Sequence, residues 1–150
     1  MMNIIRLVPK VDERLLYNYL LKVDKDFGIP LSEKVRLDLY AIRLLANGNV
    51  LAVDEDGELV SVIAFYSNDD RYRIAHLPLL STIEKARGKG YARLLISEMV
   101  KVCQQAGMLK ICCNSVNPVA ISLYKSMGFV VVSKEQDKGF EKYFLEYKII

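Results

Sequence analysis

The chain has 150 residues, of which 52% are hydrophobic and 26% are charged, and its formal net charge is +3 at pH 7. This composition is typical of a globular protein and excludes an intrinsically disordered chain. No apolar run approaches the length of a membrane span, and so mild a positive charge gives little support to nucleic-acid binding. The length predicts one domain over residues 1–150, and an N-terminus without a signal-peptide layout predicts a cytoplasmic protein.

Two helices are predicted in the N-terminal third, after a short strand. Leu15, Leu16, Tyr19, Leu20 and Val23 recur at helical spacing and share one face, which predicts a helix with Asp12 as its N-cap. Glycine and proline then interrupt the pattern, and a second helical stretch ends at an Asn-Gly pair. The predicted elements are a strand at residues 3–8, a helix at 12–23, a loop at 24–31 and a helix from 32 to about 46.

The rest of the chain alternates strands and helices. The predicted elements are strands at residues 50–53, 59–66 and 72–83, a helix at 90–105, a strand at 109–114, a helix at 118–126, and strands at 129–134 and 142–149. Turn chemistry at Asp56-Gly57 joins the first two of these strands. Because a helix connects the strands at 72–83 and 109–114, these two strands are expected to run parallel.

The stretch RGKGYA at residues 87–92 lies between a predicted strand and a predicted helix. Gly88 and Gly90 let the backbone approach a ligand closely, and the start of the helix presents unpaired N–H groups and the positive end of its dipole. Arg87 and Lys89 add positive charge. Such a site suits a pyrophosphate. The spacing matches neither a P-loop nor the G-x-G-x-x-G fingerprint of dinucleotide-binding proteins.

A second motif, NSVNPVAISLYKSMGF, occupies residues 114–129. Asn117 is a suitable helix N-cap, and Pro118 fits the first helical position, where a missing N–H costs nothing. Tyr124 lies on the apolar face of the predicted helix, and Gly128 is expected to end it. On its own this pattern describes an amphipathic helix followed by a strand.

Together the two motifs resemble the signatures of the GNAT family of N-acetyltransferases, R/Q-x-x-G-x-G/A and N-x-x-A-x-x-x-Y-x-x-x-G-F. The element order β-α-α-β-β-β-α-β-α-β-β is also that of the family, so the resemblance covers nearly the whole chain. It implies an α/β (α+β) fold, with a mixed, mostly antiparallel sheet of six to seven strands flanked by about four helices. It also implies acetyl-CoA as co-substrate.

In the family, the acyl-pantetheine arm of acetyl-CoA lies between two splayed strands, which correspond here to residues 72–83 and 109–114. The resemblance assigns cofactor binding to Leu80, Ser81, Thr82, Arg87, Gly88, Lys89, Gly90, Tyr91, Ala92 and Asn117. Asn117 is equally well explained as a helix cap. Family members often carry glycine where Ser61 or its neighbour stands, so the packing on the cofactor side is expected to differ here.

The implied reaction is attack of an amine on a thioester carbonyl. A backbone N–H within residues 80–82 is expected to hold the oxyanion. The resemblance makes Tyr124 the proton donor for the departing thiolate, the alternative being a core aromatic. His76 lies eleven residues before Arg87, where histone acetyltransferases of the family carry a catalytic glutamate, so His76 is a candidate general base. A structural role for His76, a base at Glu84 and a chain of water molecules are the alternatives.

The sequence leaves the acceptor open. By resemblance, the acceptor pocket is built from residues 24–35, 67–72 and 133–142, where carboxylates such as Asp24 and Asp26 are available to attract a cationic amine. A loose similarity to sugar-biosynthesis acetyltransferases favours an amino sugar or another small amine as the acceptor. A protein or aminoacyl-tRNA N-acetyltransferase, and a non-catalytic acyl-CoA-binding module, are the alternatives, and a homodimer is compatible with each.

No metal site is expected, because the three cysteines and the single histidine show no metal-ligand spacing. Cys112 and Cys113 are adjacent in a predicted strand, so their side chains are expected to point to opposite faces of the sheet. The cysteines are therefore interpreted as free thiols.

Overall fold

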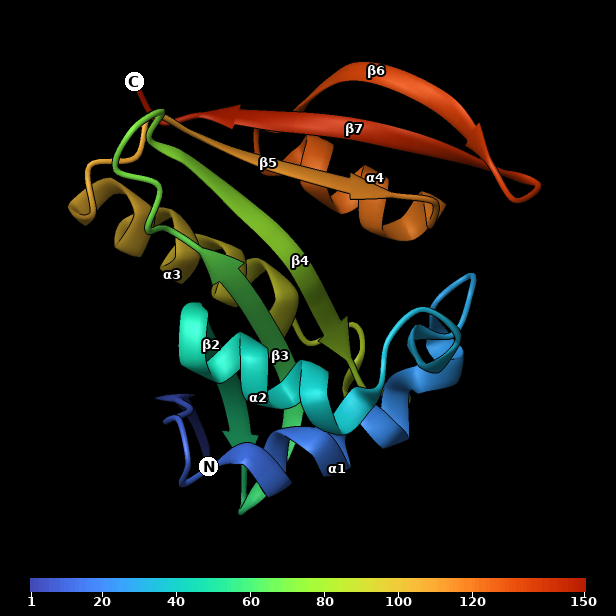
Figure 1. The fold of residues 1–150 in the computed structure, drawn as a ribbon. Helices are drawn as coiled ribbons and strands as arrows, with labels where there is room; N and C mark the ends of the chain where they lie inside the picture. Colours follow the sequence, from blue (N-terminus) through green and yellow to red (C-terminus); the bar gives the residue numbers. More distant parts are fainter.

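The computed structural model describes residues 1–150, which form a seven-stranded sheet and four α-helices (Figure 1). The strands are β1 (Met2–Arg6), β2 (Asn49–Glu55), β3 (Glu58–Tyr66), β4 (Ile74–Thr82), β5 (Lys110–Ser115), β6 (Val130–Asp137) and β7 (Phe140–Lys148). The helices are α1 (Glu13–Val23), α2 (Leu37–Asn47), α3 (Tyr91–Gln105) and α4 (Pro118–Ser126). The predicted fold class and the predicted order of elements are confirmed.

The predicted second helix is wrong at its start. Ser32 does not cap a helix, because its backbone N–H and its hydroxyl both donate to the carboxylate of Asp24, at 2.8 and 2.5 Å. Leu31–Glu33 form only a short 3₁₀ turn, and the backbone at Arg36 is extended, with φ −76° and ψ 121°. Helix α2 therefore begins at Leu37, and the loop before it is longer than predicted.

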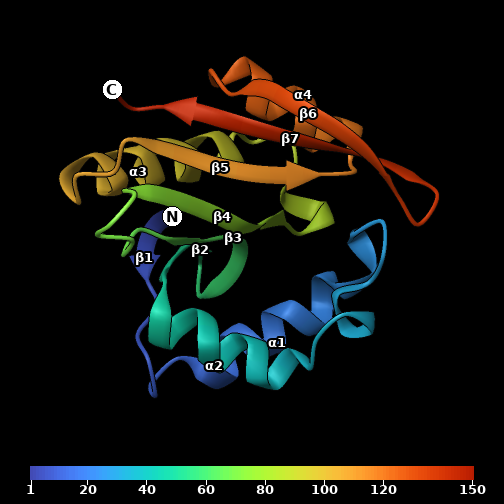
Figure 2. The same cartoon turned by 45° about the horizontal axis from the view of Figure 1, so that its top comes forward.

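Helices cover both faces of the sheet. Figure 2 shows α1 and α2 on one face and α3 and α4 on the other. Helix α1 buries four residues of its predicted apolar stripe, but Leu15, at the border of the stripe, is 41% exposed, so its predicted burial is wrong. Strand β3 lies inside the sheet and is buried continuously from Leu59 to Phe65, as expected for a strand that is covered on both faces. None of the helices is long and apolar enough to cross a membrane.

The strand order is β1-β2-β3-β4-β5-β7-β6, and β4 and β5 form the parallel pair that the sequence predicted. Their pairing runs only from Ile74 with Lys110 to His76 with Cys112. Both strands continue beyond these residues, β4 to Thr82 and β5 to Ser115, and Figure 1 shows them diverging. Each stays paired on its outer side, β4 with β3 and β5 with β7. The divergence therefore opens a gap in the middle of the sheet.

Candidate functional site

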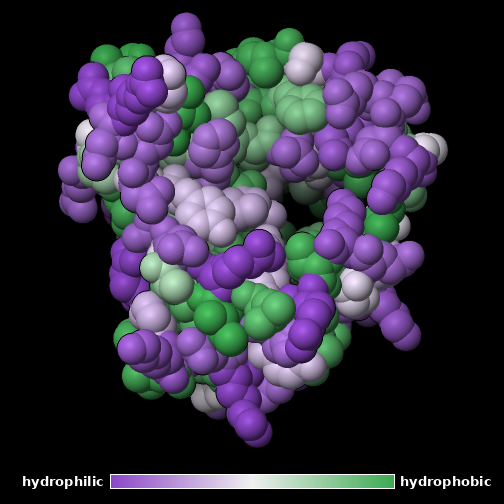
Figure 3. All heavy atoms as spheres, in the orientation of Figure 1, coloured by the Kyte–Doolittle hydropathy of each residue, from purple (hydrophilic) through white to green (hydrophobic).

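A cavity of about 760 Å³ lies where β4 and β5 diverge. Figure 3 shows a hollow in the surface in the region that Figure 1 places between β4, α4 and the loop before α2. The predicted site residues that line the cavity are Leu80, Ser81, Thr82, Arg87, Gly88, Gly90, Tyr91, Ala92, Asn117 and Tyr124. Lys89 and His76 are not among the lining residues. The fold thus brings the two sequence motifs to one cavity.

The start of α3 opens into this cavity. Gly90 is the N-cap residue of α3 and has φ +82°, and Gly88 has φ +81°, so both lie in the left-handed region that favours glycine. The first bond of the helix runs from the Leu94 N–H to the Gly90 carbonyl, at 3.1 Å. The N–H groups of the preceding turn therefore have no partner inside the helix. No side chain caps them, so they are available to an anion.

The two basic side chains of the loop are held by carboxylates. Arg87 donates through Nε to the Thr82 carbonyl at 3.1 Å and through Nη2 to Asp26 at 3.0 Å. Lys89 instead pairs with Glu55 at 3.2 Å. The hydrogen bond from the Tyr91 hydroxyl, followed by that from Lys89, lowers the pKa of the Glu55 carboxyl. Arg87 thus stays at the cavity wall, whereas Lys89 is directed away from it.

Arg93 lines the cavity although the sequence reasoning did not select it. Its guanidinium donates through Nη2 to the Ser126 hydroxyl at 2.8 Å, and so links the first turn of α3 to the end of α4. An arginine in the open first turn of a helix that begins at a glycine loop is the signal that would have found it. Arg93 adds a positive charge beside the unpaired N–H groups of α3.

Strand β4 turns one row of backbone groups toward the gap. The Ile83 N–H donates to the Val60 carbonyl at 2.9 Å, so the backbone groups of Ile83 face β3. Because the direction of these groups alternates along a strand, those of Leu80 and Thr82 face the diverging side instead. Pro78, also on that row, has no N–H to offer. An extended ligand in the gap would therefore meet the N–H groups of Leu80 and Thr82.

A cluster of hydroxyl groups forms hydrogen bonds to this part of β4 on the side that faces β3. The Tyr19 hydroxyl donates to the Ser81 carbonyl at 2.9 Å, and the Ser61 hydroxyl donates to the same carbonyl at 3.0 Å. Ser61 also shares a 2.8 Å hydrogen bond with the Thr82 hydroxyl. Ser61 is fully buried and is the only buried polar residue of the chain. The serine that stands where the family often has glycine thus forms a hydroxyl cluster with Tyr19 and Thr82, beside the part of β4 that borders the gap.

Tyr124 contributes to the opposite wall of the cavity. Only 5% of its surface is exposed, and its ring packs against Phe129 with a centroid distance of 5.3 Å. Burial, with a smaller contribution from Cys113, raises the pKa of the Tyr124 phenol above its ordinary value. The phenol is therefore protonated at neutral pH while it borders the cavity.

Asn117 has the capping role that its position predicted. Its side-chain oxygen accepts a 2.9 Å hydrogen bond from the Val119 N–H, and Pro118 occupies the first turn of α4. Asn117 also lines the cavity, so capping does not remove it from the site. The cap fixes the start of the helix that carries Tyr124.

His76 is exposed and lies at the last paired position between β4 and β5, opposite Cys112. Side chains on a strand alternate between faces, so His76 shares a face with Pro78, which does line the cavity. The two positions are separated by about 7 Å along the strand. Glu84, the alternative carboxylate, is exposed in a 3₁₀ turn and does not line the cavity.

The end of the cavity opposite α3 is bounded by the loop before α2 and by the hairpin of β6 and β7. Phe27, Ile29 and Leu31 supply apolar lining from the loop, and Asp137 and Lys142 line it from the hairpin. The loop packs tightly there, since a Cβ on Gly28 would lie 3.0 Å from Val116 and 3.6 Å from Phe140. The loop therefore packs closely against both neighbouring segments at this end of the cavity.

Three carboxylates of the segments expected to form the acceptor pocket are already engaged. Asp24 accepts from Ser32, Asp26 pairs with Arg87, and Asp69 accepts from the N–H groups of Arg71 and Tyr72. The turn of residues 67–72 contributes nothing to the lining of the cavity. Of the three segments expected to form the acceptor pocket, the structure therefore brings two to the cavity.

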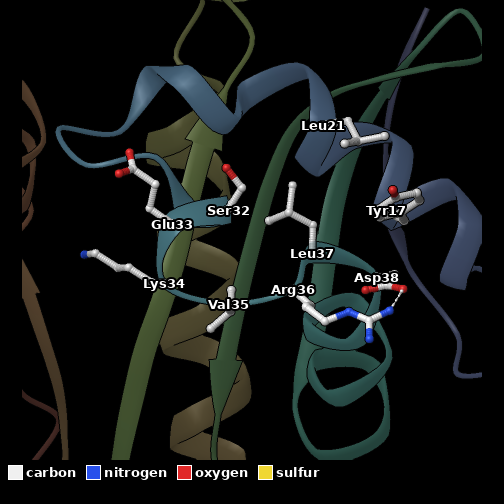
Figure 4. A pocket seen from close by; sticks show the side chains of 9 residues that line it. All are labelled: Tyr17, Leu21, Ser32, Glu33, Lys34, Val35, Arg36, Leu37 and Asp38. Carbon is white, nitrogen blue, oxygen red and sulfur yellow. Dashed lines mark hydrogen bonds and ion pairs between the residues drawn. The ribbon is translucent and has the colours of Figure 1, made fainter.

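A second hollow lies on the outer surface between α1 and the loop that leads into α2. Figure 4 shows its lining, in which Arg36 and Asp38 form an ion pair at 2.9 Å. None of the residues of the two sequence motifs lines it. The residues of the two sequence motifs therefore border the cavity between β4 and β5 and not this outer hollow.

The three cysteines are free thiols, and burial raises the pKa of Cys103 and Cys113 to about 12. Cys113 is buried while Cys112 is half-buried, in keeping with the opposite faces expected for neighbours on a strand. No group of three or more histidine, cysteine or acidic side chains is arranged to hold a metal ion.

The model of the Acetyltransferase (GNAT) family matches residues 17–129 of the chain. The protein therefore belongs to the GNAT family of acetyltransferases, and it is an enzyme of the N-acetyltransferase class. Members of the family use acetyl-CoA as co-substrate. No curated protein sequence matches significantly.

Solved structures share the fold at low sequence identity. An acetyltransferase of the GNAT family from Streptococcus pneumoniae is 18% identical, with 100% of each chain covered and a TM-score of 0.81. One from Staphylococcus aureus Mu50 is 14% identical, with 100% of each chain covered and a TM-score of 0.79. The ribosomal-protein-S18-alanine N-acetyltransferase of Escherichia coli is 14% identical over 99% of this chain and 94% of that chain, with a TM-score of 0.81. At these identities the likeness is one of fold.

Proposed function

We propose that the protein transfers the acetyl group of acetyl-CoA to the primary amine of a small molecule, by direct attack in a ternary complex, with residues 1–150 acting as one catalytic domain. The cavity between β4 and β5 carries this proposal. It reaches the start of α3 at one end and the loop before α2 at the other, so two substrates can meet inside it. The residues of the α3 end fit the phosphates of an acyl-CoA.

The start of α3 binds the pyrophosphate in this proposal. The unpaired N–H groups after Gly90 donate to the phosphate oxygens, and the positive end of the helix dipole favours their charge. Arg87 and Arg93 add guanidinium groups at the cavity wall. Lys89, which is paired with Glu55, contributes only to the surrounding potential.

The diverging edge of β4 binds the pantetheine arm. The N–H groups of Leu80 and Thr82 both face the gap. That of Thr82 donates a main-chain hydrogen bond to the arm, as when an extended peptide adds to a sheet edge, and that of Leu80 is left for the thioester carbonyl. The hydroxyl cluster behind β4 keeps this edge in place. Asn117, at the cap of α4, lines the cavity and offers its amide group to the arm from the other side.

In the reaction the amine nitrogen attacks the thioester carbonyl carbon, and the C–N bond forms as the C–S bond breaks. In this proposal the Leu80 N–H, one of the backbone donors of residues 80–82, stabilises the negative charge on the carbonyl oxygen. Tyr124 gives its proton to the departing sulfur, since burial keeps the phenol protonated at neutral pH. The attacking nitrogen loses a proton in the same process.

That proton goes either to His76 or to water. Pro78 lines the cavity, whereas His76 lies two residues earlier on the strand and outside the lining. His76 therefore needs a bridging water molecule to act as the base. Its exposure keeps it in exchange with bulk solvent. Water alone is the second route, and the pH dependence of the His76→Gln variant separates the two.

A small acceptor, such as an amino sugar or another small amine, fits the close packing of the loop before α2 against Val116 and Phe140. Folded proteins and aminoacyl-tRNA are larger acceptors that need these contacts to open. The similarity of fold to the S18-alanine acetyltransferase makes a peptide N-terminus the second candidate. A non-catalytic acyl-CoA-binding module is disfavoured because Tyr124 lies in the cavity wall.

The experiment is an acceptor screen with acetyl-CoA, read as release of free thiol. Amino sugars, small amines, a peptide with a free N-terminus and aminoacyl-tRNA form the panel, and Tyr124→Phe is the matched control. Amine-dependent thiol release that falls in Tyr124→Phe supports the proposal. Acetyl-CoA binding without thiol release from any acceptor would instead identify a binding module.

A further inference from the structure

The walls of the cavity are unequally charged. Four basic and two acidic residues line it: Lys34, Arg87, Arg93, Lys142, Asp26 and Asp137. Both carboxylates are paired, Asp26 with Arg87 at 3.0 Å and Asp137 with Lys142 at 2.8 Å. Neither carboxylate is therefore free to hold a cationic substrate, and the surplus charge of the wall is positive.

The surplus cation at the acceptor end is Lys34. It follows the 3₁₀ turn Leu31–Glu33 and forms no ion pair, and it lines both the cavity and the outer hollow of Figure 4. Across the cavity, the pKa of the Asp137 carboxyl is lowered, first by its hydrogen bond with Lys142 and also by the charges of Lys138 and Lys34. Three lysines thus surround one carboxylate at the acceptor end.

The remaining lining of this end is apolar, through Phe27, Ile29 and Leu31. Arg93, the other cation without a carboxylate partner, lies at the far end, beside the start of α3. We propose that the acceptor is an amine that also carries an anionic group, a carboxylate or a phosphate, and that Lys34 binds this group. The inference rests on the proposed acetyl transfer and names the class of its acceptor.

This charge also helps to prepare the nucleophile. An amine attacks only in its neutral form, and nearby positive charge disfavours the ammonium form and lowers its pKa. An acceptor end rich in carboxylates would have the opposite effect. Lys34 therefore favours the neutral amine in a cavity whose lining contains no histidine to accept its proton.

The test uses matched acceptors with purified full-length protein. Phenylalanine is compared with phenethylamine, and glucosamine 6-phosphate with glucosamine, so that one arm tests a carboxylate and the other a phosphate. Each pair is assayed with the wild type, with Lys34→Gln and with Lys25→Gln. Lys25 is an exposed lysine of the same loop that does not line the cavity, and so serves as the control.

In at least one pair, the anionic acceptor should have the higher kcat/KM, by about 2- to 5-fold for an ion pair with an exposed lysine. Lys34→Gln should remove this preference through KM, and Lys25→Gln should keep it. Thiol release that favours the neutral partner of both pairs, or a preference that survives in Lys34→Gln, would overturn the inference and leave the acetyl transfer standing. No release from any amine, with acetyl-CoA binding intact, would overturn the proposed function and this inference with it.

Discussion

Removing the Tyr19 or Ser61 hydroxyl tests whether the cluster behind β4 holds the cofactor edge. Tyr19→Phe deletes one donor to the Ser81 carbonyl, and Ser61→Ala deletes the other together with the bond to the Thr82 hydroxyl. Both side chains are buried, at 2% and 0% exposure, and neither substitution changes the packed volume much. The effects should therefore report the hydrogen bonds.

The structure sets the size of each effect. In Tyr19→Phe the Ser81 carbonyl keeps the Ser61 hydroxyl, so the free energy of unfolding should fall by about 1 kcal/mol, the value of one ordinary hydrogen bond. Ser61→Ala loses two bonds, and the fall should be about 1–2 kcal/mol. For a domain of this size, each kcal/mol lowers Tm by roughly 2–4 °C. Because both hydroxyls share one acceptor, the double variant should lose about 0.5 kcal/mol more than the sum.

Thermal unfolding and calorimetric titration with acetyl-CoA measure these effects. Acetyl-CoA affinity should fall by about 3- to 5-fold in each single variant, because β4 is held less firmly at the edge that meets the pantetheine arm. Tyr17→Phe is the control, since Tyr17 is a half-buried tyrosine of the same helix and does not line the cavity between β4 and β5. Wild-type stability and affinity in both single variants would refute a supporting role for the cluster.

Three further predictions concern the residues of the two motifs and of β4. Gly90→Val should abolish acetyl-CoA binding in calorimetry. Gly57→Val is the control and should keep binding, because Gly57 has a similar left-handed backbone, at φ +90°, but lies in the β2–β3 turn. Equal affinities of the two variants would show that acetyl-CoA does not bind at the start of α3. Tyr124→Phe should lower kcat by about 10²–10³-fold with little change in acetyl-CoA affinity. Because burial raises the pKa of Tyr124, wild-type kcat/KM should show no descending limb from this phenol below about pH 10, and wild-type turnover in Tyr124→Phe would leave it a core aromatic. Finally, kcat/KM should rise with pH through an apparent pKa that is absent in His76→Gln, measured with acceptors of different basicity; an unchanged ascending limb assigns the proton to water.

The sequence was most informative where the determinants of structure are local. The cap at Asn117 and Pro118, the glycines before α3 and the apolar stripe of α1 depend on neighbouring residues. All are found where they were predicted, except that Leu15 of the stripe is exposed. The parallel pairing of β4 and β5 followed from a general rule about helix-connected strands. The predicted start of α2 at Ser32 was wrong because the Ser32 hydroxyl donates to Asp24, eight residues earlier, instead of capping a helix.

The amino-acid sequence by itself therefore determined the fold class, the family and the loop at the start of α3, because caps, periodicity and glycine geometry are set within a few residues of the chain. Only the tertiary structure decided which charges face the cavity. It joined Arg87 to Asp26 across 61 residues and Lys89 to Glu55 across 34, and it placed Tyr19 on Ser81 across 62. Such pairings depend on how α1, β2 and β4 pack together, and no local pattern in the sequence records them.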